Sequence, residues 1–236
     1  EIAWGLDIFE QTFQRPAEGM WLSECAVNTA TLEALARRDV RFVVLAPHQI
    51  EAIRDPATDS WTSVDESLTA NQAFRIDLPS GKDITIVAYD GLASRAIAFD
   101  GLLHDGSNFA NRLVDAARRT GLALVSTDGE SYGHHHHRGE MALAYALEQL
   151  EARSDVQVTN VASWVARNPP KLVGRLREDS SWSCPHGVER WRSDCGCKSD
   201  FDRPWHQKWR GPLREAFEDL RDRSRTALKA QGQVLF

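Results

Sequence analysis

The sequence lacks an apolar run long enough to cross a membrane, and it lacks an excess of positive charge. A membrane-spanning helix needs about 18 or more consecutive apolar residues, and no run in the 236 residues approaches that length. The formal net charge is −6, whereas a general nucleic-acid-binding protein usually carries a basic face. We therefore expect neither a membrane nor a nucleic acid as a partner.

Cysteine is scarce and unevenly placed. Cys184, Cys195 and Cys197 fall in one short segment and Cys25 stands alone, so the dispersed pairs of a disulfide-stapled secreted domain are missing. No signal peptide is visible, and we expect a cytoplasmic protein. The chain opens on Glu1 without a methionine, which is compatible with its being part of a longer polypeptide.

Apolar and aromatic residues are plentiful. The hydrophobic fraction of 42% and the charged fraction of 26% are those of a globular protein with one sizeable domain, or one domain and a small satellite. Eight tryptophans are many for this length. They can fill a core, and they can equally form stacking platforms for sugar rings.

Buried-strand patterns alternate with amphipathic helices along the chain. Apolar spacing predicts helices at 2–13, from Asn28 onward, and at 93–103, 109–120, 139–153 and 204–231. Buried strands are predicted at 41–47 and 122–127, weaker ones at 156–161 and 171–176, and two extended runs around a turn at 79–82. This alternation indicates an α/β fold with a parallel sheet covered on both faces.

One segment, VSTDGESYGHHHHRGEM at 125–141, concentrates chemical groups after a predicted strand. Asp128 and Glu130 are two residues apart, so an extended backbone points both carboxylates the same way. Two like charges held close raise the pKa of one of them, which separates a nucleophile from an acid. Because α/β sheets and barrels collect chemistry at the carboxyl ends of strands, this pair is a catalytic candidate. The alternative is a turn-capping Asp128 and a solvated Glu130.

Three motifs in order resemble those of glycoside hydrolase family 57. TDGESYGHHH is similar to the family's nucleophile motif, and GMWLSECA at 19–26 to its W-L-P-E-C segment, with Ser23 in place of proline. VAYDGLASRAIAF at 87–99 resembles a third family stretch. The resemblance covers roughly residues 19–191.

The resemblance implies an incomplete or seven-stranded (β/α) barrel of the family 57 type with a C-terminal helical segment. Residues 1–200 would form the catalytic domain and 201–236 the start of a helical region. Family members begin with a strand bearing His-Gln-Pro, which nothing before Trp4 supplies. Pro-His-Gln at 47–49 follows a later strand. We therefore expect that the first barrel strand is missing or that the chain is part of a larger protein.

The resemblance also implies a retaining glycoside hydrolase or transglycosylase that acts on α-glucans, with an oligo- or polysaccharide substrate and no cofactor. Glu130 falls on the nucleophile position. A retaining enzyme needs a second carboxylate about 5–5.5 Å away, for which Asp179 leads and Asp128, Asp90 and Asp194 are alternatives. The expected substrate contacts are Trp21, Glu24, Asp90, Asp128, His134, Trp182 and His186.

The histidine run and the cysteine-rich segment have several interpretations each. In an extended stretch at most two of the four histidines at 134–137 can face one site, where they could contact sugar, bind a metal or only pack. Cys184, His186, Cys195 and Cys197 are four zinc-type ligands. Their one-residue gaps differ from the usual C-x-x-C knuckle, so reduced thiols are favoured over a disulfide or a structural zinc. Cys25 is interpreted as a packed thiol.

Two other functions stay open at this point. A metal-dependent polysaccharide deacetylase would use Asp128 and two of the histidines as ligands and a metal-bound water as nucleophile. A sugar-binding module without catalysis would bind glycan without turnover. Stoichiometric metal that is lost together with activity would indicate the deacetylase.

Overall fold

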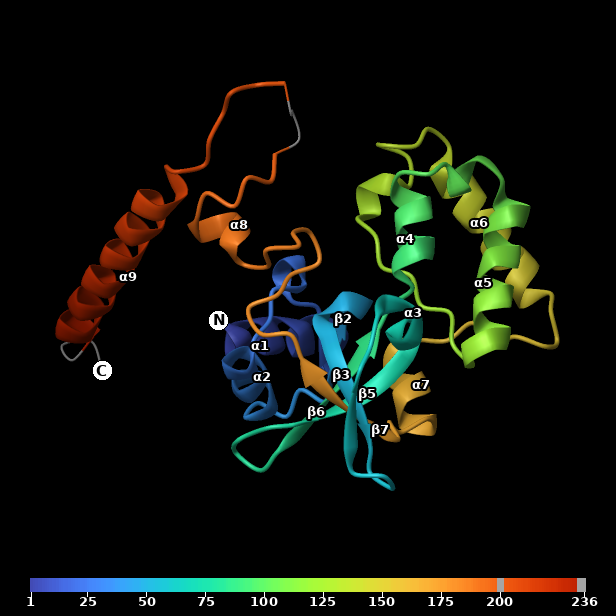
Figure 1. The fold of residues 1–236 in the computed structure, drawn as a ribbon, viewed down its shortest axis with the longest axis horizontal. Helices are drawn as coiled ribbons and strands as arrows, with labels where there is room; N and C mark the ends of the chain where they lie inside the picture. Colours follow the sequence, from blue (N-terminus) through green and yellow to red (C-terminus); the bar gives the residue numbers. More distant parts are fainter. Residues whose placement is uncertain (199–201, 233–236) are drawn as a thin grey trace.

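The computed structural model describes residues 1–198 and 202–232, and its centre is one mixed sheet (Figure 1). The seven strands lie in the order β1-β2-β6-β5-β7-β3-β4. Their bounds are β1 Gly19–Met20, β2 Phe42–Leu45, β3 Ile50–Asp55, β4 Ser60–Ser63, β5 Gln72–Asp77, β6 Asp83–Ala88 and β7 Leu172–Leu176. Within the described residues no ladder joins the edge strands β1 and β4. The sheet is therefore open, as expected of an incomplete barrel.

The expectation of an all-parallel sheet is wrong, because two tight connections reverse the chain. β2 pairs in parallel with β1 on one side and with β6 on the other. In contrast, β5 is antiparallel to β6, and β3 is antiparallel to β4 and to β7. The turn between β5 and β6 is closed by a 2.9 Å bond from Leu78 N to Lys82 O. A short turn of this kind can join only antiparallel strands.

Two helix ends lie where local sequence signals predict, whereas the helix predicted at 93–103 ends at Ala98 and the one predicted at 204–231 begins at Arg210. The Asn28 side chain accepts a hydrogen bond from Thr31 N and caps α2, and Gly121 ends α5 in the left-handed region at φ 80°. The α-helices are α1 Ile2–Phe13, α2 Thr29–Ala36, α3 Glu66–Thr69, α4 Gly91–Ala98, α5 Gly106–Thr120, α6 Gly139–Glu151, α7 Val161–Arg167, α8 Glu189–Arg192 and α9 Arg210–Gly232. Short 3₁₀ turns are η1 Ser23–Cys25, η2 Pro47–Gln49, η3 Leu102–His104 and η4 Gly129–Ser131.

Two hydrophobic clusters form the interior. The first lies between the sheet and α2 and includes Leu32, Leu35, Val43, Phe74 and Ile86. The second lies among α4, η3, α5 and α6, which form a helical lobe beside the sheet (Figure 1), and includes Ile97, Leu103, Phe109, Val114, Ala146 and Leu150. The helical lobe therefore has apolar packing of its own.

Two of the predicted strands are extended chain without a ladder. Residues 122–128 and 156–160 have no regular secondary structure. In the first segment, side chains take part of the role of a neighbouring strand: Leu124 N donates to Asn71 Oδ1 at 2.8 Å and Ser126 N to Ser94 Oγ at 3.0 Å. Leu124 O accepts from Asp90 N at 2.7 Å. The segment therefore lies beside the carboxyl end of β6, as a barrel strand would, without pairing regularly.

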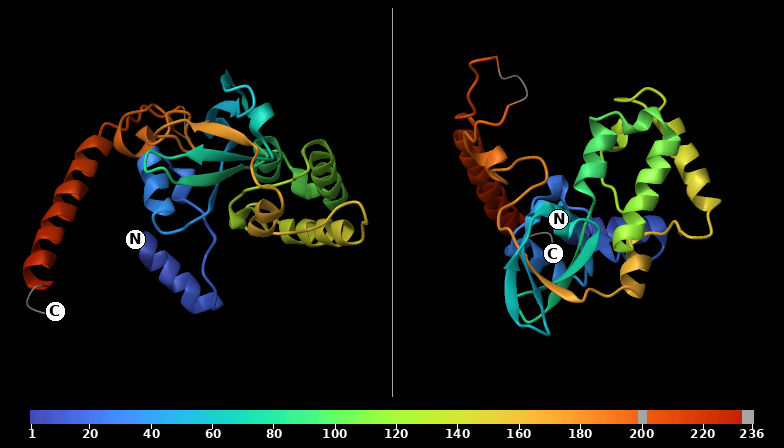
Figure 2. Two further views of the ribbon diagram at one scale, coloured as in Figure 1. Left: turned by 90° about the horizontal axis from the view of Figure 1, so that it is seen from below. Right: turned by 45° about the vertical axis from the view of Figure 1, so that its right-hand side comes forward.

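α9 extends away from the sheet (Figure 2), whereas α1 packs against the first hydrophobic cluster through Ile2 and Leu6. α9 is amphipathic as predicted, and its apolar side chains Leu213, Phe217, Leu220 and Leu228 are exposed. None of the described helices is both long enough and apolar enough to span a bilayer.

Candidate functional site

Three aromatic side chains from distant parts of the chain meet beside the ends of β1 and β6. Trp21 follows β1, Tyr89 follows β6, and Trp182 comes from the segment after β7. The rings of Trp21 and Trp182 pack edge to face with centroids 5.1 Å apart, and those of Tyr89 and Trp182 with centroids 6.3 Å apart. We call these three residues the aromatic cluster. Trp21 is 47% exposed, so the cluster offers an indole to a ligand from solvent.

Glu24 lies against the aromatic cluster in an unusual backbone conformation. Its Oε2 accepts hydrogen bonds from Trp182 Nε1 at 3.2 Å and from Ser183 Oγ at 2.5 Å. Glu24 and Cys25 have φ values of 57° and 49°, in the left-handed region that costs a non-glycine residue about 1–2 kcal/mol. Strain of this kind is concentrated at functional sites. The carboxylate is thus fixed beside the predicted sugar-stacking residues.

His48 and Gln49 support this arrangement from η2. Gln49 is completely buried and donates from Nε2 to Cys25 O at 2.8 Å and to Ser180 Oγ at 3.0 Å. His48 Nε2 lies 3.0 Å from Ser181 O. Gln49 thus ties the turn that carries Glu24 to the segment that leads to Trp182, and His48 contacts the same segment. Sequence reasoning noted the end of β2 but missed this role, because the partners are distant in sequence.

The loop that carries Glu130 lies on the helical lobe. The Glu130 side chain is 71% exposed, and its Oε2 lies 3.8 Å from His135 Nε2. The histidines are not extended as expected: His134 N and His135 N both donate to Glu130 O, which folds them into a turn. As a result the neighbouring rings of His134 and His135 lie together, with centroids 5.1 Å apart.

The aspartates suggested as the second carboxylate differ in their surroundings. Asp90 is buried and caps α4, since Oδ1 accepts from Ala93 N and Oδ2 from Asn71 Nδ2. Asp179 is half exposed and accepts from Asn28 Nδ2 at 3.0 Å and from Arg192 Nη2 at 3.4 Å. Asp194 Oδ1 accepts from Gln207 N at 2.8 Å. Asp128, by contrast, is exposed at the start of the Glu130 turn.

The predicted site residues thus fall into separate groups. Trp21, Glu24 and Trp182 are in contact, whereas no hydrogen bond or ion pair between described residues joins Glu130 to Asp179. Tyr89 completes the first group and was missed, although the pattern of a tyrosine directly after a buried strand could have suggested it.

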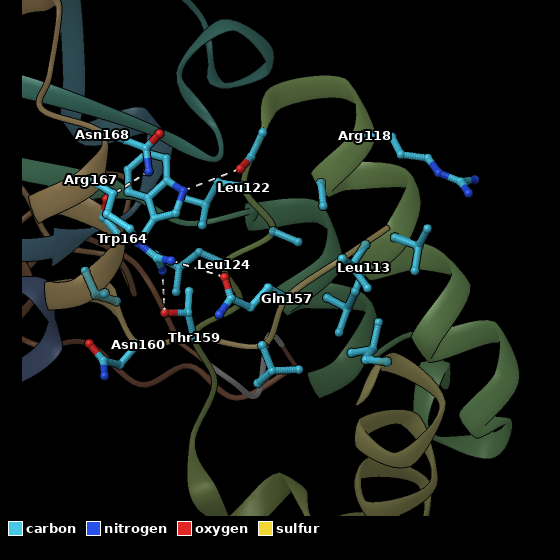
Figure 3. A pocket seen from close by; sticks show the side chains of 18 of the residues that line it. Leu113, Arg118, Leu122, Leu124, Gln157, Thr159, Asn160, Trp164, Arg167 and Asn168 are labelled. Atoms are coloured by element: carbon cyan, nitrogen blue, oxygen red, sulfur yellow. Dashed lines mark hydrogen bonds between the residues drawn. The ribbon is translucent and has the colours of Figure 1, made fainter. Parts of the chain in front are cut away.

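A hollow of about 650 Å³ opens between α5, α7 and residues 122–124 (Figure 3). Trp164 lines it and donates from Nε1 to Gly121 O at 3.4 Å, and Arg167 bonds to Gln157 and Thr159 beside it. The two candidate glutamates, Glu24 and Glu130, lie outside the lining of this hollow.

His186 lies among the cysteines, with Nδ1 3.7 Å from Cys184 Sγ and 3.4 Å from Cys197 Sγ. Cys184, His186, Cys195 and Cys197 come together with all four ligand atoms within 4.8 Å of one another. Among described residues this is the one group of three or more His, Cys, Asp or Glu able to share an ion. Asp128 and the histidine run form no such group among the described residues.

With this geometry established, comparison with known proteins defines the class. The sequence model of glycosyl hydrolase family 57 matches residues 1–177, and the chain belongs to this family. A domain of unknown function, DUF3536, matches residues 205–236, which include α9. No curated protein matches the chain.

Solved structures share the fold at low sequence identity. An exo-type maltose-forming amylase from Pyrococcus sp. ST04 superposes with a TM-score of 0.74 at 16% identity, over 96% of this chain and 42% of the amylase. A 4-alpha-glucanotransferase from Thermococcus litoralis gives 0.57 at 14% identity, over 75% and 27%. A family 57 branching enzyme from Thermococcus kodakaraensis gives 0.57 at 17%, over 80% and 46%. The chain therefore spans less than half the length of these relatives.

Proposed function

We propose that this chain carries the catalytic centre of a retaining glycoside hydrolase or transglycosylase that acts on α-glucans. Family membership supports the reaction class. The three solved relatives are named as an amylase, a glucanotransferase and a branching enzyme, which supports an α-glucan substrate. The observation that carries the proposal is Glu24, a carboxylate fixed by Trp182 beside exposed Trp21. The free thiols suit a reducing, cytoplasmic compartment.

Double displacement needs a nucleophilic carboxylate, and two glutamates are candidates. The sequence motif assigns this role to Glu130, whose exposed carboxylate is free to meet a substrate. The surroundings favour Glu24, because a nucleophile must be held rigidly at a sugar-stacking surface. Glu24 has two side-chain hydrogen bonds and a strained backbone beside the aromatic cluster.

The reaction also needs an acid that protonates the leaving oxygen and later activates water or an acceptor hydroxyl. Asp179 is the candidate from sequence; in this geometry it would have to release Asn28 and Arg192. Asp128 is the alternative, because its exposed side chain lies on the loop that follows residues 122–127, beside the carboxyl end of β6. Hydrolysis and transfer then differ only in which acceptor reaches the glycosyl-enzyme.

Trapping the covalent intermediate tests the nucleophile. The protein is incubated with a fluorinated glucosyl donor that reacts and then hydrolyses slowly, and the tryptic peptides are mapped by mass spectrometry. An adduct on the peptide bearing Glu24 supports the geometric assignment, and one on the peptide bearing Glu130 supports the motif assignment. No adduct on either peptide, with full activity in both Glu24→Gln and Glu130→Gln, contradicts the proposed mechanism. Glu140→Gln, at the first turn of α6, is the matched control.

The acid is tested with substrates that differ in their leaving group. Asp128→Asn and Asp179→Asn are compared on a natural glucan and on an activated aryl glucoside, whose leaving group needs little protonation. The variant of the true acid loses turnover of the glucan by about 10²–10⁴-fold. On the activated substrate it keeps kcat/KM, because departure of that leaving group needs little protonation, and azide raises kcat by replacing the water that the missing base no longer activates. Equal losses on both substrates in both variants would exclude both residues as the acid.

A further inference from the structure

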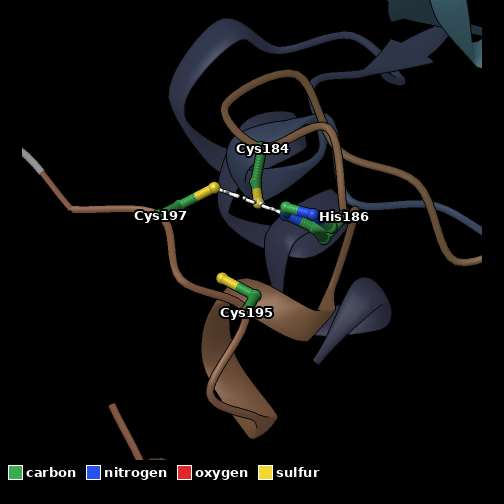
Figure 4. A group of neighbouring side chains, drawn as sticks. All are labelled: Cys184, His186, Cys195 and Cys197. Carbon is green, nitrogen blue, oxygen red and sulfur yellow. Dashed lines mark hydrogen bonds between the residues drawn. The ribbon is translucent and has the colours of Figure 1, made fainter. Parts of the chain in front are cut away.

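The cysteine-rich segment brings four side chains to one point (Figure 4). Cys184 Sγ lies 3.6 Å from Cys197 Sγ and 3.7 Å from His186 Nδ1, and Cys197 Sγ lies 3.4 Å from the same nitrogen. Cys195 completes the group, in which all four ligand atoms lie within 4.8 Å of one another. None of the four residues takes part in the catalytic proposal.

Three of these separations match the distances expected between the ligands of a tetrahedral zinc ion. With Zn–S bonds of about 2.3 Å and Zn–N bonds of about 2.0–2.1 Å, tetrahedral angles place two sulfurs about 3.8 Å apart and a sulfur and a nitrogen about 3.6 Å apart. The three distances of 3.4–3.7 Å among Cys184, His186 and Cys197 match these values. A disulfide needs two sulfurs about 2.05 Å apart, and all four cysteines are free.

Only one residue separates the two ligands of each pair, and a glycine with positive φ lies in or directly after each pair. Gly187 has φ 61° and its N–H donates to Cys184 O at 2.9 Å, so the chain turns back immediately after His186. Gly196 has φ 82° between Cys195 and Cys197, which turns both flanking sulfurs to one side. Each pair of ligands is therefore presented by a sharp turn, as in a zinc knuckle with longer spacing.

A second layer of contacts surrounds the ligands. Gln207 is buried; its Oε1 accepts from Gly196 N at 3.1 Å and its Nε2 donates to Cys197 O. Arg210 Nη1 lies 3.5 Å from Cys195 Sγ. Three thiolates and Zn²⁺ leave one net negative charge, which the Arg210 guanidinium compensates. Such outer contacts orient metal ligands in proteins.

We propose that Cys184, His186, Cys195 and Cys197 bind one structural Zn²⁺ that joins the Trp182 segment to the start of the C-terminal region. Four protein ligands with no open position define a structural and not a catalytic site. Thiolate with imidazole selects zinc over magnesium or calcium. The ion crosslinks residues 184–186 to residues 195–197, and Arg190 Nη1 and Ser181 Oγ tie the same loop to Ser183 O and Gly187 O. Trp182 is thereby held against Glu24.

Metal analysis of the protein purified under reducing conditions tests this site. Elemental analysis should give one Zn²⁺ per chain, and replacement by Co²⁺ should give the intense visible bands of a tetrahedral, thiolate-rich site. Cys184→Ser and Cys197→Ser should each reduce zinc to near zero. Cys25→Ala, which removes a buried thiol outside the cluster, should keep one zinc per chain.

A measurement on the unaltered chain covers the case in which a variant fails to fold. Chelation of the wild-type protein should lower Tm by about 5–10 °C, because a structural zinc contributes directly to folding free energy, and added Zn²⁺ should restore it. Zinc far below one per chain with four titratable thiols would overturn the proposal. So would a chain 2 Da lighter with a Cys184–Cys197 disulfide that forms under the same conditions. Both readouts are independent of catalytic activity, so they do not depend on the proposed function.

Discussion

The indole N–H of Trp182 donates a 3.2 Å hydrogen bond to the carboxylate of Glu24, a residue 158 positions earlier in the chain. The backbone N–H of Trp182 also donates to Glu24 O at 3.1 Å. The two residues therefore cannot move independently, and the position of the carboxylate depends on the segment that follows β7. This relationship links the candidate chemistry to the packing of the cysteine-rich loop.

Replacing Trp182 by phenylalanine should lower kcat/KM on an oligosaccharide by about tenfold. The change keeps an aromatic ring against Trp21 but removes the donor to Glu24; a hydrogen bond to a charged group contributes about 1.5–3 kcal/mol, part of which water recovers at this partly exposed site. Trp61→Phe is the control, since Trp61 lies on edge strand β4 under Arg175. Equal rates in all three proteins would mean that the Trp182–Glu24 bond has no role in catalysis.

Glu33 should give the protein an acid-sensitive contribution to stability. The backbone N–H of Ser80 donates a 2.7 Å hydrogen bond to Glu33 and holds the pKa of its carboxyl below the usual 4.5, against the opposing effect of burial. A lowered folded-state pKa stabilises above the unfolded-state pKa and loses this contribution as pH falls through the folded value. The Tm of the wild type should therefore fall more steeply below about pH 4.5 than that of Glu33→Gln.

The matched control for that titration is Glu10→Gln on α1, where the side chain is exposed. Its Tm should follow the wild type at every pH. If the Tm of Glu33→Gln falls with decreasing pH as steeply as that of the wild type, then the hydrogen bond from Ser80 does not contribute to the pH dependence of stability.

Gly187→Ala should destabilise the protein by about 3 kcal/mol or more. A Cβ at Gly187 would lie 2.0 Å from Asp179 O, and φ is 61°, so backbone strain and a backbone clash act together. Gly129→Ala is the control, because its Cβ would meet nothing within 4 Å. Denaturant unfolding measures both. If Gly187→Ala lowers the free energy of unfolding no more than Gly129→Ala does, then the turn at Gly187 accommodates a Cβ without a large cost.

Cys25 should resist alkylation in the folded protein. Burial, with a smaller effect of Glu24, raises the pKa of its thiol to about 12, so only about 10⁻⁴ of it is thiolate at pH 8. In zinc-free protein iodoacetamide should label Cys195 before Cys25, since the Cys195 thiol is partly exposed and that of Cys25 is buried. Peptide mapping before and after unfolding measures this order. Rapid native labelling of Cys25 would contradict the burial of its thiol.

Local elements could be predicted from the sequence because their causes are local. The Asn28 cap, the Gly121 stop and the turn between β5 and β6 each depend on residues a few positions apart. The family motifs likewise singled out Trp21, Glu24 and Trp182 as substrate contacts, and the structure brings these three side chains together. These features need no knowledge of distant partners.

Other features could not be predicted, since their partners are distant. Residues 122–127 look like a buried strand, but their backbone bonds go to the side chains of Asn71 and Ser94, which no pattern in the segment encodes. The histidine run turns because two of its N–H groups share Glu130 O. The cysteine spacing alone does not encode the positive φ values of Gly187 and Gly196, which accompany the grouping of the four ligand atoms.

The anomeric configuration of the first product tests the proposed catalysis most directly. Proton NMR during the first minutes of hydrolysis of an α-linked oligosaccharide records the released sugar before mutarotation. A retaining enzyme with a glutamate nucleophile releases the α-anomer first, with the β-anomer appearing only as the solution equilibrates. Initial release of the β-anomer would show single displacement and contradict a covalent intermediate on either Glu24 or Glu130.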